Sequence, residues 1–377
     1  MTRVYLHIGA PKTGTTYLQA VLFRNRARLR AGGVLYPGEG ADAHFRATLD
    51  LRGLRFGGYD DPAVRGAWQR LARQVRAFEG ERVVVSHELL AGTPEDVIDR
   101  ALDDIGHEDV HVVLTARDLG RQVPAVWQEM VKNNQTLSYE RYLDQVTGAR
   151  KGRGARIFWR QQDTAEVLAR WSQRVPPERV HLITVPPPGS PSALLWERFC
   201  VVLGVVPGDY DAAAPRANAS LGLADAELVR RVNEALDDRL DWPDYAPLVK
   251  GGLAEKVLAA RLAGDRARVP DELRGWFDES ADNMINAVSQ RGYHVVGDLD
   301  ELRPVHGDAG AVAAPPPDQV VDAAAYALAE LLVAQAQRDR SGTGRLVAGA
   351  SSRLSGRIRR LAHGLLPSRL RRSTNRG

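Results

Sequence analysis

The feature that most constrains the fold is an alternation of short β-branched runs with longer helical patterns over the first 300 residues. The runs predict strands at residues 4–8, 82–86, 110–115 and 180–185. Helices are predicted at residues 15–28, 62–78, 94–105, 121–132, 163–174, 194–203 and 224–240. Because the strand runs do not alternate apolar with polar residues, they are typical of strands buried on both faces. The sequence therefore predicts an α/β, three-layer fold, with a central parallel sheet flanked by helices.

The chain changes character near residue 300, which predicts three parts. Residues 1–300 form the α/β domain, residues 301–322 a low-complexity linker rich in Ala and Pro, and residues 323–377 a helical, basic tail. A helix is expected over 323–336. Residues 341–377 hold nine arginines and no acid, with an amphipathic spacing over 353–361. A solvated tail, peripheral attachment to an anionic membrane, and contact with a partner protein or nucleic acid remain alternatives for it.

Composition narrows the class of protein. Apolar residues make up 44% and charged residues 26%, which is a soluble globular balance. The sequence has no stretch of 18 consecutive apolar residues, so no transmembrane helix is expected. The N-terminus also lacks the apolar run of a signal peptide. We therefore expect a cytoplasmic protein. Cys200 is the one cysteine, which excludes an intrachain disulfide and a cysteine-based zinc site. The tail accounts for the net positive charge, so we expect no nucleic-acid binding by the body.

A glycine-rich loop follows the first expected strand and opens a helix. Its sequence is Gly9-Ala-Pro-Lys-Thr-Gly-Thr-Thr16. The spacing of its glycines matches a phosphate-binding P-loop, except that Thr15 replaces the usual lysine and Lys12 lies inside the loop. Backbone N–H groups at a helix N-terminus attract anions, and Lys12 adds a full positive charge. Hydroxyl donors come from Thr13, Thr15 and Thr16. We therefore expect a P-loop-like fold that binds a phosphate-like group here.

The segment Pro11-Lys-Thr-Gly14-Thr-Thr-Tyr-Leu18 resembles the phosphosulfate-binding loop of sulfotransferases that use 3′-phosphoadenosine 5′-phosphosulfate (PAPS). The family's pattern is Pro-Lys-Ser/Thr-Gly-Thr-Thr, often followed by Trp, where this chain has Tyr17. The resemblance implies that Lys12, Thr13, Gly14, Thr15 and Thr16 bind PAPS. It also implies that Lys12 stabilises charge on the oxygen between sulfur and phosphorus.

A second candidate binding site follows the strand at 110–115. Arg117 ends this strand, and Arg121 lies one helical turn further on. An arginine at the carboxyl edge of a parallel sheet suits bidentate binding of phosphate. The segment also resembles the second PAPS motif of sulfotransferases, in which an arginine and a serine eight residues later bind the 3′-phosphate. Here Ala125 stands at the serine position, so Arg121 or a backbone group would have to substitute.

The strand at 82–86 ends in two candidates for the general base, His87 and Glu88. Transfer of a sulfuryl group to a hydroxyl needs a group that removes the acceptor's proton. The resemblance favours Glu88, as in bacterial sulfotransferases, with His87 second. If the strand continued, the two side chains would point to opposite faces, and only one would face the cleft.

Other motifs are weaker, and no metal is predicted. His107 and His111 match the zinc-protease spacing HExxH, but His111 enters an expected strand, where the two side chains would lie too far apart to share a metal. The basic stretch 150–156 is either a solvated loop or an anion-attracting one. Segments 32–80, 133–160 and 205–290 are expected to shape the acceptor pocket. A carbohydrate, a lipid or a small metabolite remains open as acceptor.

The sequence thus predicts a PAPS-dependent sulfotransferase. Two alternatives remain. One is a P-loop kinase or NTPase, which would need a lysine after Gly14 and an acid that binds magnesium. The other is a protein of the same fold that binds the nucleotide but does not catalyse transfer. This alternative remains because Ala125 stands where the family has a serine.

Overall fold

The computed structural model describes residues 1–148, 152–213, 220–261, 265–305 and 314–340. The chain divides into two compact units, Met1–Ala323 and Ala324–Gly377. No helix in the described ranges is long and apolar enough to cross a membrane.

The first unit is built on a six-stranded sheet in the order β2-β3-β1-β4-β5-β6, in which every strand pair is parallel. The strands are β1 (Arg3–His7), β2 (Val34–Leu35), β3 (Arg82–Ser86), β4 (Val110–Ala116), β5 (Val180–Thr184) and β6 (His294–Val296). The four expected strands are present within one residue at each end. The short edge strands β2 and β6 were not predicted.

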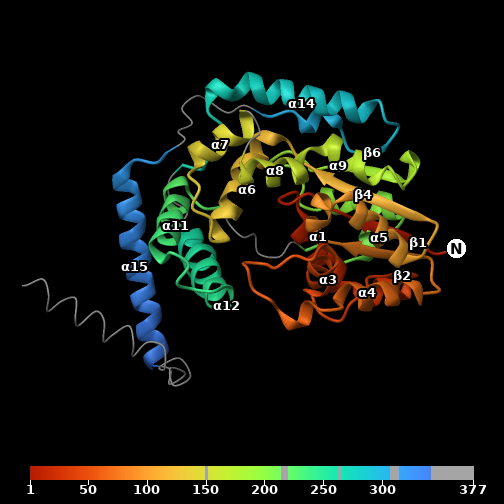
Figure 1. Cartoon of the computed structure of the whole chain (residues 1–377), viewed down its shortest axis with the longest axis horizontal. Coiled ribbons are helices and arrows are strands. Elements are labelled where there is room, and N and C mark those ends of the chain that lie inside the picture. Colours follow the sequence, from red (N-terminus) through yellow and green to blue (C-terminus); the bar gives the residue numbers. More distant parts are fainter. Residues whose placement is uncertain (149–151, 214–219, 262–264, 306–313, 341–377) are drawn as a thin grey trace, which may run out of the picture. The chain divides into compact units, whose positions relative to one another are not determined.

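Helices cover both faces of the sheet (Figure 1), and the predicted α/β class is confirmed. The helices are α1 (Thr15–Arg24), α2 (Arg26–Ala31), α3 (Ala43–Arg52), α4 (Ala67–Arg76), α5 (Glu95–Ile105), α6 (Leu119–Lys132), α7 (Tyr139–Thr147), α8 (Arg153–Gln162), α9 (Thr164–Trp171), α10 (Leu194–Leu203), α11 (Leu223–Leu236), α12 (Trp242–Tyr245), α13 (Ala259–Arg261), α14 (Arg274–Ser289) and α15 (Pro317–Arg340). A π-helical segment, Ala246–Leu258, joins α12 to α13.

Two apolar clusters pack on opposite sides of the sheet. Along β1, Val4 and Leu6 belong to one cluster, which also contains residues of α4, α5 and α9. Tyr5 belongs to the other, with residues of α1, α2 and α10. Neighbouring residues of a strand point to opposite faces, so an apolar strand feeds both clusters. This is why the sheet-forming runs are mostly apolar on both faces.

Two expected helices are interrupted. The helix predicted over 15–28 divides into α1 and α2, because the Asn25 amide side chain donates to the carbonyls of Val21 and Asp211 at the junction. The helix predicted over 62–78 begins as a short 3₁₀ turn, Pro62–Val64, and α4 starts only after Gly66, whose φ is +70°. The basic stretch 150–156 lies partly outside the described residues.

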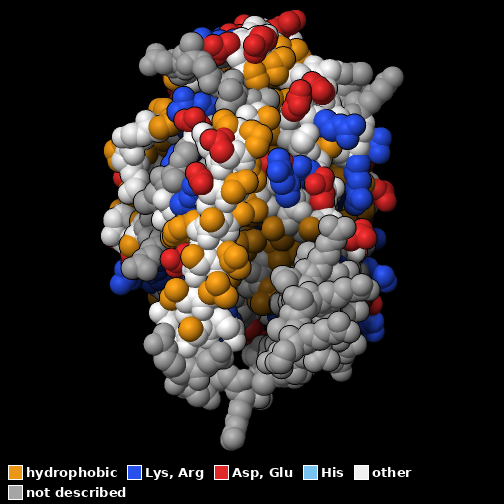
Figure 2. All heavy atoms as spheres, turned by 90° about the vertical axis from the view of Figure 1, so that its left-hand side faces the viewer, with side chains coloured by type: hydrophobic (Ala, Val, Ile, Leu, Met, Phe, Trp, Pro, Cys, Tyr) orange, Lys and Arg blue, Asp and Glu red, His pale blue; other side chains and the backbone are white. Residues whose placement is uncertain are grey.

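The second unit is described only over its helical part, the C-terminal portion of α15. This helix contains the predicted helix 323–336 but starts earlier, at Pro317. Several of its large apolar side chains are exposed to solvent, namely Leu328, Leu331, Leu332 and Val333. Figure 2 shows hydrophobic side chains along this helix. The arginine-rich segment 341–377 lies outside the described residues.

Candidate functional site

The strand order has a switch point between β1 and β4, at the carboxyl edge of the sheet. β1 lies between β3 and β4, so the chain leaves β1 for one side of the sheet and later crosses to the other. Ligands of open α/β folds bind at such a switch point. The loop after β1, the turn after β3 and the link between β4 and α6 all lie at this edge. They carry Lys12, Glu88 and Arg117 respectively.

The loop over residues 8–14 is held in shape by two glycines. Gly9 and Gly14 have φ of +65° and +84°, a region that side-chain-bearing residues rarely adopt. A Cβ on Gly9 would lie 2.8 Å from the Cα of Glu88, and one on Gly14 would lie 2.4 Å from Leu195 Cδ2. Gly14 also caps α1 without any side-chain hydrogen bond, so the first N–H groups of α1 are not capped by a side chain. They are free to bind an anion.

A buried chain of hydrogen bonds supports the loop from below. The Thr13 hydroxyl donates to the Ala10 carbonyl at 2.6 Å and lies 2.6 Å from the Thr115 hydroxyl. Thr115 lies 3.4 Å from His7 Nε2, and His7 Nδ1 lies 2.7 Å from the Ser86 hydroxyl. Thr13 is 1% exposed, so these bonds of its hydroxyl hold the loop in place. Thr15 is also buried, whereas Thr16 is exposed.

Burial keeps His7 neutral, because desolvation lowers the pKa of its imidazole to about 4. A second buried histidine, His44, supports the same strand end. Its Nδ1 accepts a hydrogen bond from the Ser86 backbone N–H at 3.1 Å, so Nε2 carries the proton and donates to the Pro37 carbonyl. Burial lowers the pKa of His44 to about 4 as well. Neither histidine was singled out from the sequence.

His87 and Glu88 do not point to opposite faces, because β3 ends at Ser86 and Glu88 opens a 3₁₀ turn, Glu88–Gly92. His87 Nε2 and Glu88 Oε2 lie 3.9 Å apart. His87 Nδ1 accepts from the Leu89 N–H at 3.2 Å, so in the neutral ring Nε2 carries the proton. Burial lowers the pKa of His87. In this tautomer, neutral His87 has no free ring nitrogen that could take a proton from the substrate that receives the sulfuryl group.

Glu88 is ionised and a quarter exposed. Burial alone would raise the pKa of its carboxyl, whereas hydrogen bonds from its own backbone, Gln19 and Thr15 act to lower it. Gln19 Nε2 donates to Oε2 at 3.2 Å. Three arginines hold the 3₁₀ turn that carries Glu88, and all donate to its carbonyls: Arg52 to Leu89 and Gly92, Arg160 to Gly92, and Arg170 to Ala91.

Lys12 has a partner that the sequence did not suggest. Its Nζ lies 2.6 Å from Glu129 Oε2, on α6. The other oxygen of Glu129 lies 2.7 Å from Lys250 Nζ, on the π-helical segment. Burial would raise the pKa of the Glu129 carboxyl, but the two ammonium groups hold it well below its usual range. These residues are more than 100 positions apart in the chain, so no local pattern could reveal the cluster.

Arg117 and Arg121 line one cavity of about 480 Å³ together with Ala125. Arg117 donates to the Gln122 side chain and to the Arg121 carbonyl, both at 2.9 Å. Arg121 pairs with Asp118. Burial and the neighbouring Arg121 lower the pKa of Arg117 to about 10, so it remains charged at neutral pH.

The same cavity receives three further arginines, Arg266, Arg268 and Arg274. Arg274 pairs with Asp271. Within the described ranges, no carboxylate lies within ion-pairing distance of Arg266 or Arg268, and both are exposed. Sequence reasoning missed this pair, although the Arg-x-Arg spacing just before Pro270 is a local basic signal. The cavity therefore holds an excess of positive charge.

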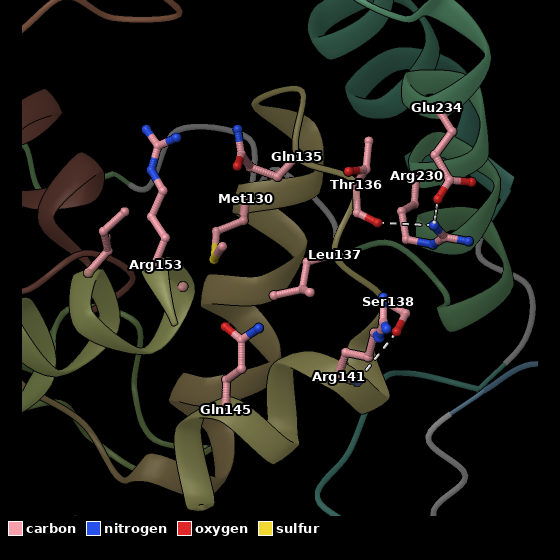
Figure 3. A pocket seen from close by; sticks show the side chains of 12 residues that line it. Met130, Gln135, Thr136, Leu137, Ser138, Arg141, Gln145, Arg153, Arg230 and Glu234 are labelled. Atoms are coloured by element: carbon pink, nitrogen blue, oxygen red, sulfur yellow. Dashed lines mark hydrogen bonds and ion pairs between the residues drawn. The ribbon is translucent and has the colours of Figure 1, made fainter. Parts of the chain in front are cut away.

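A second cavity, of about 390 Å³, lies among α6, α7, α8 and α11 (Figure 3). Met130 and Leu137 project into its centre, and Arg230 on one wall bonds Glu234 and the Thr136 carbonyl. Its lining residues fall mainly in two of the segments expected to shape an acceptor pocket, 133–160 and 205–290. None of the predicted site residues lines it.

Among the described residues, no group of three or more His, Cys, Asp or Glu side chains is placed to bind a metal ion. His107 and His111 do not share a helix. His107 precedes β4, and His111 on β4 bonds His181 and Asp109.

No protein-family model matches the chain, and no curated protein matches it. Among solved structures, a sulfotransferase from Alicyclobacillus acidocaldarius is similar at 16% identity. The similarity covers 65% of this chain and 99% of that one, with a TM-score of 0.38. A likeness at this level assigns neither an activity nor a substrate.

Proposed function

We propose that this protein is a sulfotransferase that moves the sulfuryl group of PAPS to a hydroxyl or amine of an acceptor. The observation that carries the proposal is the meeting, at one switch point, of an uncapped helix N-terminus, a lysine in the preceding loop, an ionised carboxylate and an arginine-lined cavity. Together they match a donor with two anionic ends and an acceptor that must lose a proton.

Each residue has a role in this proposal. The N–H groups of Thr15 and Thr16 and the Lys12 ammonium bind the phosphosulfate. Arg117, with Arg121, binds the 3′-phosphate, and Arg266 and Arg268 replace the hydroxyl that Ala125 lacks. These arginines supply full positive charge where a serine would supply one neutral donor, and charge-assisted hydrogen bonds are roughly twice as strong as neutral ones.

Glu88 is the proposed base, since His87 has no free ring nitrogen in its hydrogen-bonded tautomer. The Glu88 carboxylate takes the acceptor's proton as the acceptor oxygen bonds to sulfur. The bond between sulfur and the bridging phosphate oxygen breaks in line, and adenosine 3′,5′-bisphosphate leaves with its new charge beside Lys12.

The test is transfer of labelled sulfate from PAPS to a panel of carbohydrate, lipid and small-metabolite acceptors. Lys12→Met should lower transfer at least 100-fold with the fold intact, because electrostatic stabilisation of the leaving oxygen is lost. Lys256→Met removes an exposed lysine and should leave the rate unchanged. Wild-type rates from Lys12→Met would reject the role of Lys12. Magnesium-dependent ATP turnover without sulfate transfer would favour a P-loop NTPase instead.

A further inference from the structure

Lysine is rare in this chain, and its few lysines are concentrated at the proposed site. Of 51 basic residues, 46 are arginines and five are lysines, at positions 12, 132, 151, 250 and 256. Lys151 lies outside the described residues. Three of the other four, Lys12, Lys132 and Lys250, are ion-paired to Glu129 or Glu255. This part of the molecule therefore uses ammonium groups where the rest of the chain uses guanidinium groups.

The ion pairs around Glu129 are connected to one another. Glu129 Oε2 accepts a hydrogen bond from Lys12 at 2.6 Å, and Glu129 Oε1 accepts one from Lys250 at 2.7 Å. Asn133 adds a contact to each partner: Nδ2 lies 3.3 Å from Glu129 Oε1, and Oδ1 lies 2.8 Å from Lys250 Nζ. Beside them, Lys132 pairs with Glu255 at 3.7 Å. Both oxygens of Glu129 are thus occupied by different ammonium groups.

Local structure supports a functional role for Lys250. It lies on the π-helical segment Ala246–Leu258, and wide turns of this kind occur frequently at functional sites. Its ammonium group is 6.0 Å from the ring centroids of both Phe56 and Trp242. An ammonium group is compact and has three rotatable donors, so it can bond Glu129 and Asn133 together, whereas a planar guanidinium has a fixed fork.

Resting on the proposed function, we infer that Glu129 and Lys250 are positioning residues for Lys12. In the structure, Glu129 holds the Lys12 ammonium beside the loop. When the anionic donor binds, Lys12 exchanges Glu129 for the donor's oxygen, and Glu129 keeps Lys250 as its remaining partner. Without Lys250, the release of Lys12 would leave a half-buried carboxylate unpaired, which costs free energy. Lys250 thereby makes Lys12 available to the donor without contacting the donor itself.

Nucleotide binding should then be weakened by one substitution and restored by a second. Lys250→Met should weaken binding of adenosine 3′,5′-bisphosphate about tenfold, because the release of Lys12 would then leave the Glu129 carboxylate without an ammonium partner. The double variant Glu129→Gln with Lys250→Met should restore the affinity, since no carboxylate then retains Lys12. Lys256→Met, on the same segment but exposed, should bind as the wild type does. A merely structural role for Lys250 predicts no rescue by a second substitution, so a double variant no better than Lys250→Met overturns the inference.

A spectroscopic readout separates this inference from the proposed function. With ¹³Cε-labelled lysine, the full chain gives at most five lysine methylene signals, which single variants assign. In the absence of any ligand, the Lys12 signal should shift in Glu129→Gln and in Lys250→Met, but not in Lys256→Met. Lys250→Gln repeats the test if Lys250→Met does not fold. An unchanged Lys12 signal in folded Lys250 variants overturns the inference, whether or not the protein binds nucleotide. A shifted signal together with no nucleotide binding by the wild type would instead reject the proposed function.

Discussion

Acidification should destabilise the end of β3, where the proposed base lies, well before the carboxylates titrate. Burial lowers the pKa of both His7 and His44 to about 4, from the ordinary value of 6.5. The folded protein therefore keeps both rings neutral, while the unfolded chain binds protons below about pH 6.5. Stability is present above that pH and falls as the pH drops towards 4, because the unfolded state takes up more protons.

The size of the effect follows from these two values. A pH of 5 is about 1.5 units below the pKa of histidine in the unfolded chain, and each unit corresponds to about 1.4 kcal/mol of free energy of unfolding. Each buried histidine then costs roughly 2 kcal/mol, and the two together on the order of 4 kcal/mol. Burial also lowers the pKa values of His87 and His181, which adds to the effect in the same direction.

The assay is urea unfolding between pH 7.5 and pH 5, followed by circular dichroism. His44→Asn offers a matched test, because its Oδ1 can accept from the Ser86 N–H without titrating in this range. This variant should lose about half of the pH dependence assigned to the two rings. An equal slope in His44→Asn and the wild type, or stability that does not change between pH 7.5 and pH 5, would refute the reasoning.

Two further predictions concern the loop and the turn that carries the base. Gly14→Ala and Gly53→Ala each force a side chain into a positive-φ position, at a cost of about 1–2 kcal/mol, but only Gly14→Ala should weaken phosphate binding by more than tenfold in a calorimetric titration. Equal binding by both variants would contradict the role of the loop. Arg52→Met removes two hydrogen bonds to the 3₁₀ turn of Glu88 and should lower kcat roughly tenfold with nucleotide affinity unchanged. Arg55→Met, at an exposed neighbour, should change neither quantity in steady-state kinetics.

Local patterns were sufficient for the layers of the fold. The strands β1, β3, β4 and β5 are mostly apolar runs of five to seven residues, a length typical of strands rather than helices. β2 and β6 are two and three residues long, and pairing with a neighbour rather than their own sequence makes them strands. The division of the first helix depends on Asp211, a residue 186 positions from Asn25, which the sequence could not connect to it.

The candidate site divides in the same way. Arg117 follows β4 directly, Glu88 lies two residues after β3 and Lys12 five residues after β1, so the sequence alone could place all three at one edge of the sheet. Glu129 and Lys250 face each other from elements that only the tertiary fold brings together. The orientation of His87 and Glu88 was unpredictable for another reason, since it depends on the residue at which β3 ends.

The most direct test of the central claim is calorimetric binding of adenosine 3′,5′-bisphosphate by the full chain. We predict binding by the wild type, about 10- to 100-fold weaker binding of adenosine 5′-monophosphate, and a similar loss in Lys12→Met and Arg117→Met, since each change removes one charge-assisted contact. Equal affinity for the two nucleotides, or no binding of either by folded wild-type protein, would contradict the account.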